Sequence, residues 1–284
     1  MKERGDVLEK LKTYFENKPE VVIALLFGSQ AENRANAASD WDIGIYFKPK
    51  EYSELETSSD YPNESKIWSE LINITGSDLV DLVVLNRASP SLLYQTLQKG
   101  EPISIKNRGL YLDLLNKSGY EAADWWDFVA DYWQISERSK SLAPENKARI
   151  IEYLRFLENE YEELDAIKKI TWKNYLEDGF KRKIIERWVE NMAMSALDIA
   201  KVVLASEKKE APSSYKETLR TFAILHLDLS PEEAESFGEI ARLRNIVVHD
   251  YLDLKWKRIS AFVAKAETLY PNFIARAKEI INQD

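Results

Sequence analysis

The pattern of hydrophobic positions changes character near residue 107. Before that point, short runs rich in valine, isoleucine, leucine and aromatic residues alternate with stretches of helical periodicity, and such runs are typical of buried strands. The runs that predict strands are 21–27, 41–47, 79–85 and 102–105. The stretches that predict amphipathic helices are 3–17, 64–75 and 90–99. We therefore expect an α+β domain, with a small mixed sheet and flanking helices, over residues 1–107.

Beyond residue 107 the apolar positions follow helical spacing almost throughout. The stretches with this spacing are 110–139, 144–172, 176–206 and 255–282. Pro144, Pro212 and Pro231 lie where helices would begin, and Ser230 is a candidate N-cap. Five of the eight tryptophans lie in residues 125–188, where we expect them in the core or between helices. The pattern predicts that residues 108–284 form an all-α helical bundle.

Composition narrows the class of protein. The 284-residue chain has no cysteine, which excludes disulfides, zinc–thiolate sites and thiol nucleophiles, and suits a reducing compartment. Its charged first residues lack the apolar core of a signal peptide, and we expect a soluble cytoplasmic protein without a membrane anchor. The net charge of -9 argues against a protein that coats nucleic acid. Two basic clusters, at 181–183 and 255–258, are interpreted as solvated helix faces rather than an RNA track.

Two aspartates open the second predicted strand. Asp40 and Asp42 are separated by one residue, so on a strand their side chains point to the same side. Two carboxylates that lie so close repel each other, and a divalent cation relieves that repulsion. Because magnesium prefers oxygen ligands, the pair indicates a Mg2+ site.

A third acid and a glycine extend this pattern. Asp81 is a lone charge inside an apolar run, and a buried charge is costly unless it is paired or bound to a metal. Gly28 and Ser29 follow the first strand, where glycine permits a tight turn and close approach to a ligand. A helix that begins there would offer N–H groups to a phosphate. A phosphate cradle beside a carboxylate cluster is what phosphoryl transfer with two metal ions requires.

The spacing Gly28-Ser29-x10-Asp40-x-Asp42 resembles the signature of the polymerase-β-like nucleotidyltransferases, and the small domain resembles their minimal branch. The resemblance covers about residues 1–107. It implies Gly28 and Ser29 at the triphosphate of ATP, Asp40 and Asp42 as ligands of Mg2+, and Asp81 as a third ligand or base. Transfer of a nucleoside monophosphate from ATP to an acceptor is the activity that it implies.

The chain departs from the family pattern after the glycine and serine. Many relatives continue with alanine, arginine and glycine, whereas this chain has Glu32 at the usual arginine position. Arg34 follows close behind and is the candidate that supplies the missing positive charge to the triphosphate.

The second candidate site contains one of the two histidines. His226 lies in an apolar stretch and is interpreted as a core or boundary residue, whereas His249 follows two arginines. On a helix, Arg242 and Asn245 would share a face with His249, and the long side chain of Arg244 would reach it. Imidazole moves protons near neutral pH and guanidinium holds phosphate. This pair suits RNA cleavage by the neighbouring 2′-hydroxyl, although a structural histidine with surface arginines is the alternative.

The spacing Arg244-x4-His249-x-Tyr251 is similar to the motif of HEPN domains, with Asn245 also fitting the pattern. Arg242-x6-His249 satisfies a looser form, so the choice of arginine stays open. The resemblance implies a metal-independent RNase site formed by Arg244 and His249, with RNA as substrate, and a homodimer in which two motifs face each other.

In toxin–antitoxin pairs of these two families, the transferase attaches AMP to the tyrosine of the HEPN motif. The chain resembles both partners fused, which implies Tyr251 as the acceptor of AMP. One alternative is a small-molecule nucleotidyltransferase of the aminoglycoside-modifying type, which also has a helical C-terminal domain. Another alternative is a non-catalytic binding module whose helical part only dimerises.

Overall fold

The computed structural model describes residues 4–31, 40–50, 53–138, 142–245 and 252–282. The chain divides into two compact units, Met1–Trp125 and Trp126–Asp284. The predicted boundary at residues 107 and 108 coincides with the start of helix α5, Arg108–Arg138, and the division between the compact units lies further along the same helix. The predicted fold class is confirmed, because a small mixed sheet with helices is followed by a helical region.

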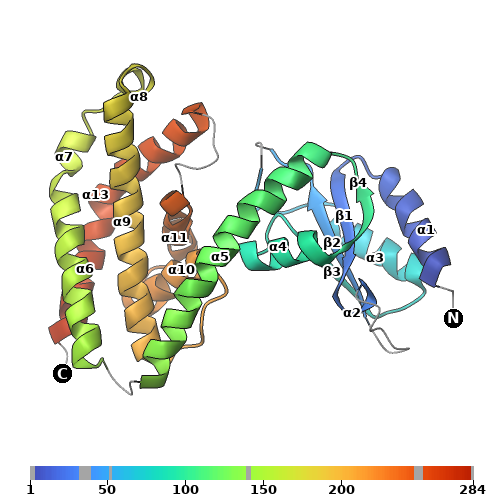
Figure 1. The fold of residues 1–284 in the computed structure, drawn as a ribbon, viewed down its shortest axis with the longest axis horizontal. Helices are drawn as coiled ribbons and strands as arrows, with labels where there is room; N and C mark the ends of the chain where they lie inside the picture. The colour runs from blue at the N-terminus through green and yellow to red at the C-terminus, as the bar shows by residue number, and fades with distance from the viewer. Residues whose placement is uncertain (1–3, 32–39, 51–52, 139–141, 246–251, 283–284) are drawn as a thin grey trace. The chain divides into compact units, whose positions relative to one another are not determined.

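The first unit is built around a four-stranded sheet in the order β3-β2-β1-β4 (Figure 1). Its elements are α1 (Arg4–Glu16), β1 (Val21–Phe27), α2 (Gly28–Ala31), β2 (Trp41–Phe47), α3 (Glu64–Thr75), β3 (Val80–Val84), α4 (Pro90–Lys99), β4 (Glu101–Ile105) and the first part of α5. Strand β1 pairs antiparallel with β2 and β4, whereas β2 pairs parallel with β3. These elements agree with the sequence-based prediction to within one residue at almost every boundary.

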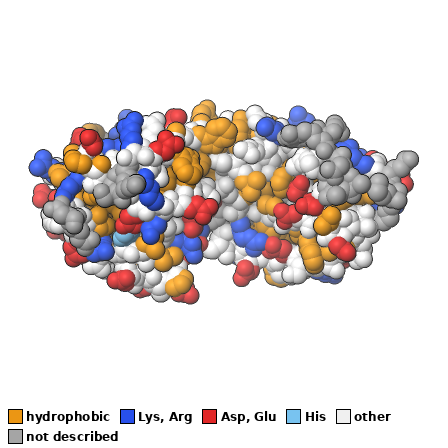
Figure 2. All heavy atoms as spheres, turned by 90° about the horizontal axis from the view of Figure 1, so that it is seen from below, with side chains coloured by type: hydrophobic (Ala, Val, Ile, Leu, Met, Phe, Trp, Pro, Cys, Tyr) orange, Lys and Arg blue, Asp and Glu red, His pale blue; other side chains and the backbone are white. Residues whose placement is uncertain are grey.

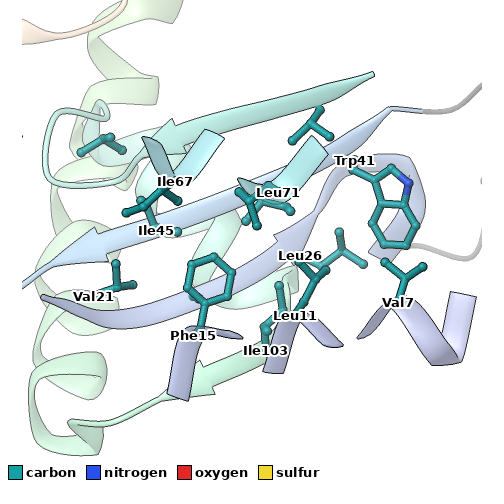
Figure 3. Close-up of a cluster of buried hydrophobic side chains, with 14 of the residues drawn as sticks. Val7, Leu11, Phe15, Val21, Leu26, Trp41, Ile45, Ile67, Leu71 and Ile103 are labelled. Atoms are coloured by element: carbon teal, nitrogen blue, oxygen red, sulfur yellow. The ribbon is translucent and has the colours of Figure 1, made fainter. Parts of the chain in front are cut away.

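Both faces of this sheet are covered. Helices α1 and α3 pack on one face, where Leu11, Phe15 and Leu71 bury their side chains against β1 and β2 (Figure 3). Helix α4 and the start of α5 cover the other face, where Leu93 and Leu114 are fully buried. A strand covered on both faces reads as a continuous apolar run, which explains the sequence of β1. Polar side chains are therefore confined to the ends of the strands.

The second unit is helical. Its elements after α5 are α6 (Pro144–Glu162), α7 (Leu164–Ile167), α8 (Trp172–Glu177), α9 (Gly179–Ser206), α10 (Tyr215–His226), α11 (Pro231–Gly238), the 3-10 helix η1 (Glu239–Asn245) and α13 (Leu252–Asn282). Helix α9 is buried on every side from Ile199 to Ser206, so it is the central helix of this unit. Among the helices of the described residues, none has the length and apolar character needed to cross a membrane.

Local signals explain where the helical prediction succeeds and where it is wrong. Pro144 and Pro231 do occupy the first turn of α6 and α11, and Ser230 accepts a hydrogen bond from the Glu233 amide. Pro212 does not begin a helix, because α10 starts after the cap Ser214. The single helix expected over 144–172 is instead α6 and α7, followed by a new helix that Thr171 caps.

A charged network joins three helices of this unit. Asp131 on α5 accepts hydrogen bonds from Arg149 on α6 at 2.7 and 3.2 Å, and its Oδ2 lies 2.8 Å from Lys201 Nζ on α9. The Lys201 side chain is only 7% exposed, so its charge depends on Asp131 and Asp198. Burial raises the pKa of Asp131, but the hydrogen bonds and charges of Arg149 and Lys201 outweigh burial and lower the pKa to about 2.

Asp131→Asn is expected to reduce the free energy of unfolding by about 1.5–3 kcal/mol at pH 7, because a charged hydrogen-bond partner is lost beside buried Lys201. The folded-state pKa of Asp131 is below its unfolded value, so this contribution is present above about pH 4 and declines as the pH falls toward 2. Urea unfolding followed by circular dichroism at pH 7 and pH 3 measures both effects. Asp127→Asn, an exposed change one turn earlier on α5, is the control. An equal loss at both pH values would contradict the prediction.

Candidate functional site

Two of the predicted site carboxylates lie side by side in the sheet. Asp42 on β2 is the direct partner of Asp81 on the parallel strand β3, and it is also the partner of Phe27 at the end of β1. Directly paired residues of neighbouring strands project from the same face of a sheet, so the two carboxylates share one face. Asp40 precedes β2 by one residue and lies two positions before Asp42. The sheet thus brings the three acids of the sequence motif to one end of its strands, where β1 ends and β2 and β3 begin.

The glycine of the motif lies directly against the Asp42 carboxylate at this end of the strands. Gly28 has a φ of 68°, a left-handed conformation that other residues adopt only at a cost. A Cβ atom at Gly28 would lie 2.1 Å from Asp42 Oδ2, far inside van der Waals contact. Glycine is therefore required here twice, for its backbone conformation and for the close approach of the Asp42 carboxylate. No sequence spacing alone establishes that second requirement.

The electrostatics of Asp42 reflect this crowding. Partial burial raises the pKa of Asp42, and the negative charges of Asp81 and Asp40 raise it further. Asp40 and Asp81 are both exposed to solvent. A bound cation would offset the repulsion that the three carboxylates exert on one another, which is the chemical property that a metal site needs.

The acids are not gathered around a single point in the described residues, where no group of three acidic, histidine or cysteine residues is placed to hold a metal ion. Mg2+ does not require such a cage, because it keeps several waters and is commonly bound by one or two carboxylates together with substrate phosphates. The oxygen donors of Asp42 and its two acidic neighbours fit that mode of binding.

The structure describes only part of the segment that is predicted to bind the triphosphate. Ser29 lies in the short helix α2, and the described part of that helix is a single turn. Glu32 and Arg34 lie outside the described residues, so the contribution of Arg34 stays a prediction. Arg4 was not predicted from the sequence as part of this site. Its guanidinium donates a hydrogen bond to the Gln30 carbonyl at 3.2 Å and pairs with Glu101. Arg4 thereby holds the turn after Gly28 from the neighbouring helix, a long-range contact that no motif signals.

The second motif begins in η1 rather than in an α-helix. The two candidate arginines differ in environment. Arg242 is exposed and its Nη1 lies 2.7 Å from Glu239 Oε2. Arg244 is 8% exposed, and its guanidinium carbon lies 3.9 Å from the ring centroid of Tyr215 on α10. A guanidinium that lies over an aromatic ring is attracted by the face of the ring, so Tyr215 restricts the position of the Arg244 side chain.

His249 and Tyr251 lie outside the described residues, so their distance from either arginine stays a prediction. The expectation that an α-helix carries both arginines is wrong, because η1 has the tighter winding of a 3-10 helix. His226 is a core or boundary residue, as its apolar stretch predicts. Its side chain is 7% exposed, its Nε2 lies 3.3 Å from Glu207, and burial lowers its pKa.

Gly28→Ala is expected to destabilise the sheet unit by about 1 kcal/mol or more, because alanine at positive φ is strained and its Cβ displaces Asp42. Hydrogen exchange of β1 and β2 peptides should be faster, whereas peptides from α9 serve as an internal reference. Gly5→Ala is the matched control, because it lies in α1 with no atom within 4 Å of its added Cβ. That control should change stability by less than about 1 kcal/mol. Unchanged exchange in Gly28→Ala would refute the packing argument.

Comparison with known families identifies two domains in the chain. Residues 9–109 match the model of the polymerase beta nucleotidyltransferase family, and residues 150–278 match the ribonuclease HepT-like family. No curated protein matches the chain. The first match contains Gly28, Asp42 and Asp81, and the second contains both candidate arginines. The chain is therefore a fusion of a polymerase-beta-like nucleotidyltransferase domain with a HEPN domain of the ribonuclease HepT-like family.

Proposed function

We propose that the nucleotidyltransferase domain transfers AMP from ATP to Tyr251 of the HEPN domain, and that the HEPN domain is an RNase that this transfer inhibits. The observation that supports the transferase activity is the close approach of Gly28 to the Asp42 carboxylate, beside Asp81 on the adjoining strand. A domain of this family with a backbone turn packed against its carboxylates has both parts of a nucleotidyl-transfer site.

Each residue of the motif has a proposed role in nucleotidyl transfer. The backbone at Gly28 and Ser29 binds the triphosphate, with Arg34 as its proposed cation. Asp40 and Asp42 would hold two Mg2+ ions. The bound ions would neutralise the negative charge of the phosphates and favour the deprotonated form of the acceptor hydroxyl. Asp81 faces Asp42 across the strand pair and serves as third ligand or as the base that takes the acceptor proton.

The transfer step balances without any further reactant. The phenol oxygen of Tyr251 forms a bond to the α-phosphorus of ATP as its proton passes to a base. The bond from that phosphorus to the oxygen bridging to the β-phosphate breaks, and pyrophosphate leaves with the bonding electrons. The product is a tyrosyl phosphodiester, which adds bulk and negative charge two residues from His249.

In the RNase site, His249 exchanges protons while Arg244 or Arg242 binds the phosphate. The 2′-hydroxyl of the RNA attacks the adjacent phosphorus and the bond to the 5′-oxygen breaks, leaving a 2′,3′-cyclic phosphate and a 5′-hydroxyl. This chemistry needs no metal. The stacking of Arg244 on Tyr215 supports Arg244 as the phosphate ligand, because a guanidinium held in one plane loses less freedom on binding.

Asp42→Asn is expected to reduce AMP transfer at least about 100-fold, because the variant loses a negatively charged ligand of the metal. The full-length protein is incubated with Mg2+ and ATP, and intact-mass measurement followed by peptide mapping detects the adduct. Asp60→Asn, an exposed change in the same unit, should retain full transfer. Tyr251→Phe should show no adduct at that peptide. Transfer only to an added aminoglycoside would instead support a small-molecule transferase, and no transfer to either acceptor would contradict an active transferase domain.

His249→Ala is expected to reduce RNA cleavage by about 100-fold or more, because the proton-transfer group is lost. Cleavage is measured in EDTA with a labelled RNA, so that metal-dependent nucleases do not contribute. His226→Gln, the change at the other histidine, should leave cleavage unchanged. Arg244→Lys and Arg242→Lys are compared under the same conditions. The phosphate ligand is the arginine whose substitution reduces RNA cleavage more. Cleavage that persists in His249→Ala would exclude the HEPN motif as the RNase site.

A further inference from the structure

The two basic clusters of the helical unit come together around a group of aromatic rings. Trp172 on α8 lies 6.0 Å from Trp256 on α13, measured between ring centroids, and Tyr175 lies 5.9 Å from Trp172 and 5.3 Å from Trp256. Trp256 belongs to the basic cluster 255–258, and the cluster 181–183 begins α9 immediately after α8. Segments more than seventy residues apart in the sequence are therefore neighbours in the fold.

Buried polar contacts hold this aromatic group in place. The Tyr175 hydroxyl donates a hydrogen bond to Glu186 on α9 at 2.5 Å, and both residues are buried. Lys255 Nζ on α13 lies 4.0 Å from the same Glu186 carboxylate. One carboxylate thus links α8, α9 and α13 beside the Tyr175 ring.

Large apolar side chains are exposed on α8 and in the first turns of α9. Phe180 is 73% exposed, Trp172 is 36% exposed and Leu176 is 43% exposed. Ile184 follows Phe180 by one helical turn and is also exposed. Clustered exposed aromatic side chains are characteristic of binding surfaces rather than of ordinary solvent-facing helices.

The charge around these side chains is strongly positive. Residues 168–184 contain six basic and two acidic side chains, in a chain whose net charge is -9. Within the described part of the chain, the basic residues 181–183 form no ion pair, whereas each of the other lysines and arginines of α9 and α10 is paired with a carboxylate. On the face drawn in Figure 2, by contrast, basic and acidic side chains are interspersed. The surface formed by Trp172, Phe180, 181–183 and Trp256 is called here the aromatic–basic surface.

We propose that the aromatic–basic surface binds single-stranded RNA, with unpaired bases stacked on Phe180 and Trp172 and phosphates contacted by Lys181, Arg182 and Lys183. Exposed aromatic rings beside unneutralised cations are the combination that single-stranded nucleic acids require. A second copy of this chain is a poorer occupant, because a two-fold contact would place the same cations opposite one another. The proposal rests on the proposed RNase function, to which it adds a binding surface separate from the cleavage motif.

The position of the surface in the chain supports this role. Helix α13 begins at Leu252, directly after the segment that contains His249, and Lys255 and Trp256 lie in its first turns. RNA held at Trp256 is therefore bound by residues that follow the cleavage motif within a few positions. Solvated helix faces at 181–183 and 255–258 would not by themselves explain why Trp172 and Phe180 are exposed.

The test measures binding of a fluorescein-labelled oligouridylate to the full-length protein by fluorescence anisotropy, in EDTA and with the His249→Ala variant as background to prevent cleavage. Phe180→Ala should weaken binding by roughly 5- to 100-fold, because one stacked base is lost. The triple change Lys181→Gln, Arg182→Gln and Lys183→Gln should reduce the slope of log affinity against log salt by about 2, as expected for the loss of three phosphate contacts. An abasic oligomer should be insensitive to Phe180→Ala but sensitive to the triple change.

Phe156→Ala on α6 and the pair Lys208→Gln with Lys209→Gln are the matched controls, because they remove an exposed phenylalanine and exposed lysines elsewhere on the same unit. Both should bind like the background protein. If Phe180→Ala and the triple change bind RNA normally, the proposal is overturned, and a change in sedimentation with unchanged binding identifies the surface as a protein interface. RNA cleavage is measured separately in the protein that retains His249. If RNA binding depends on the aromatic–basic surface but no cleavage is found, the proposed RNase function is contradicted and the binding proposal is not.

Discussion

The contact between Gly28 and the Asp42 carboxylate is the constraint on which the first domain depends. Asp42 lies in the middle of a row that runs from Phe27 at the end of β1 to Asp81 on β3. Because no side chain fits at position 28, the backbone turn lies directly beside the negative charges. The rest of the sheet unit supports this arrangement, with helices packed on both faces and Arg4 holding the turn from α1.

Much of this arrangement was predictable from the sequence. The apolar runs of β1 and β2 and the helices at 64–75 and 90–99 have the predicted bounds, since strands covered on both faces and strongly amphipathic helices give unambiguous patterns. The row of Asp42 and Asp81 was also foreseeable, on the condition that the two strands are neighbours. The strand order and the parallel pairing that meet this condition come from the fold.

Other features depend on contacts that a linear pattern does not contain. Helix α6 ends at Glu162 and α8 begins after the Thr171 cap, although the apolar spacing continues across this stretch. The stacking of Arg244 on Tyr215 and the meeting of Trp172 with Trp256 join residues far apart in the sequence. The environment of each of these side chains depends on a residue far away in the sequence. Local helix propensity does not predict which residue that is.

The covering of both sheet faces has a consequence for how an acceptor approaches the transferase site. Helices pack on both faces of the strands, so the route to the carboxylates at the end of β1 and the start of β2 runs past the strand ends rather than through either face of the sheet. An acceptor hydroxyl embedded in the flat side of a helix would meet those covering helices before it came within bonding distance of a nucleotide. The geometry favours acceptors at the tip of a projecting segment over hydroxyls that lie flat against a helix.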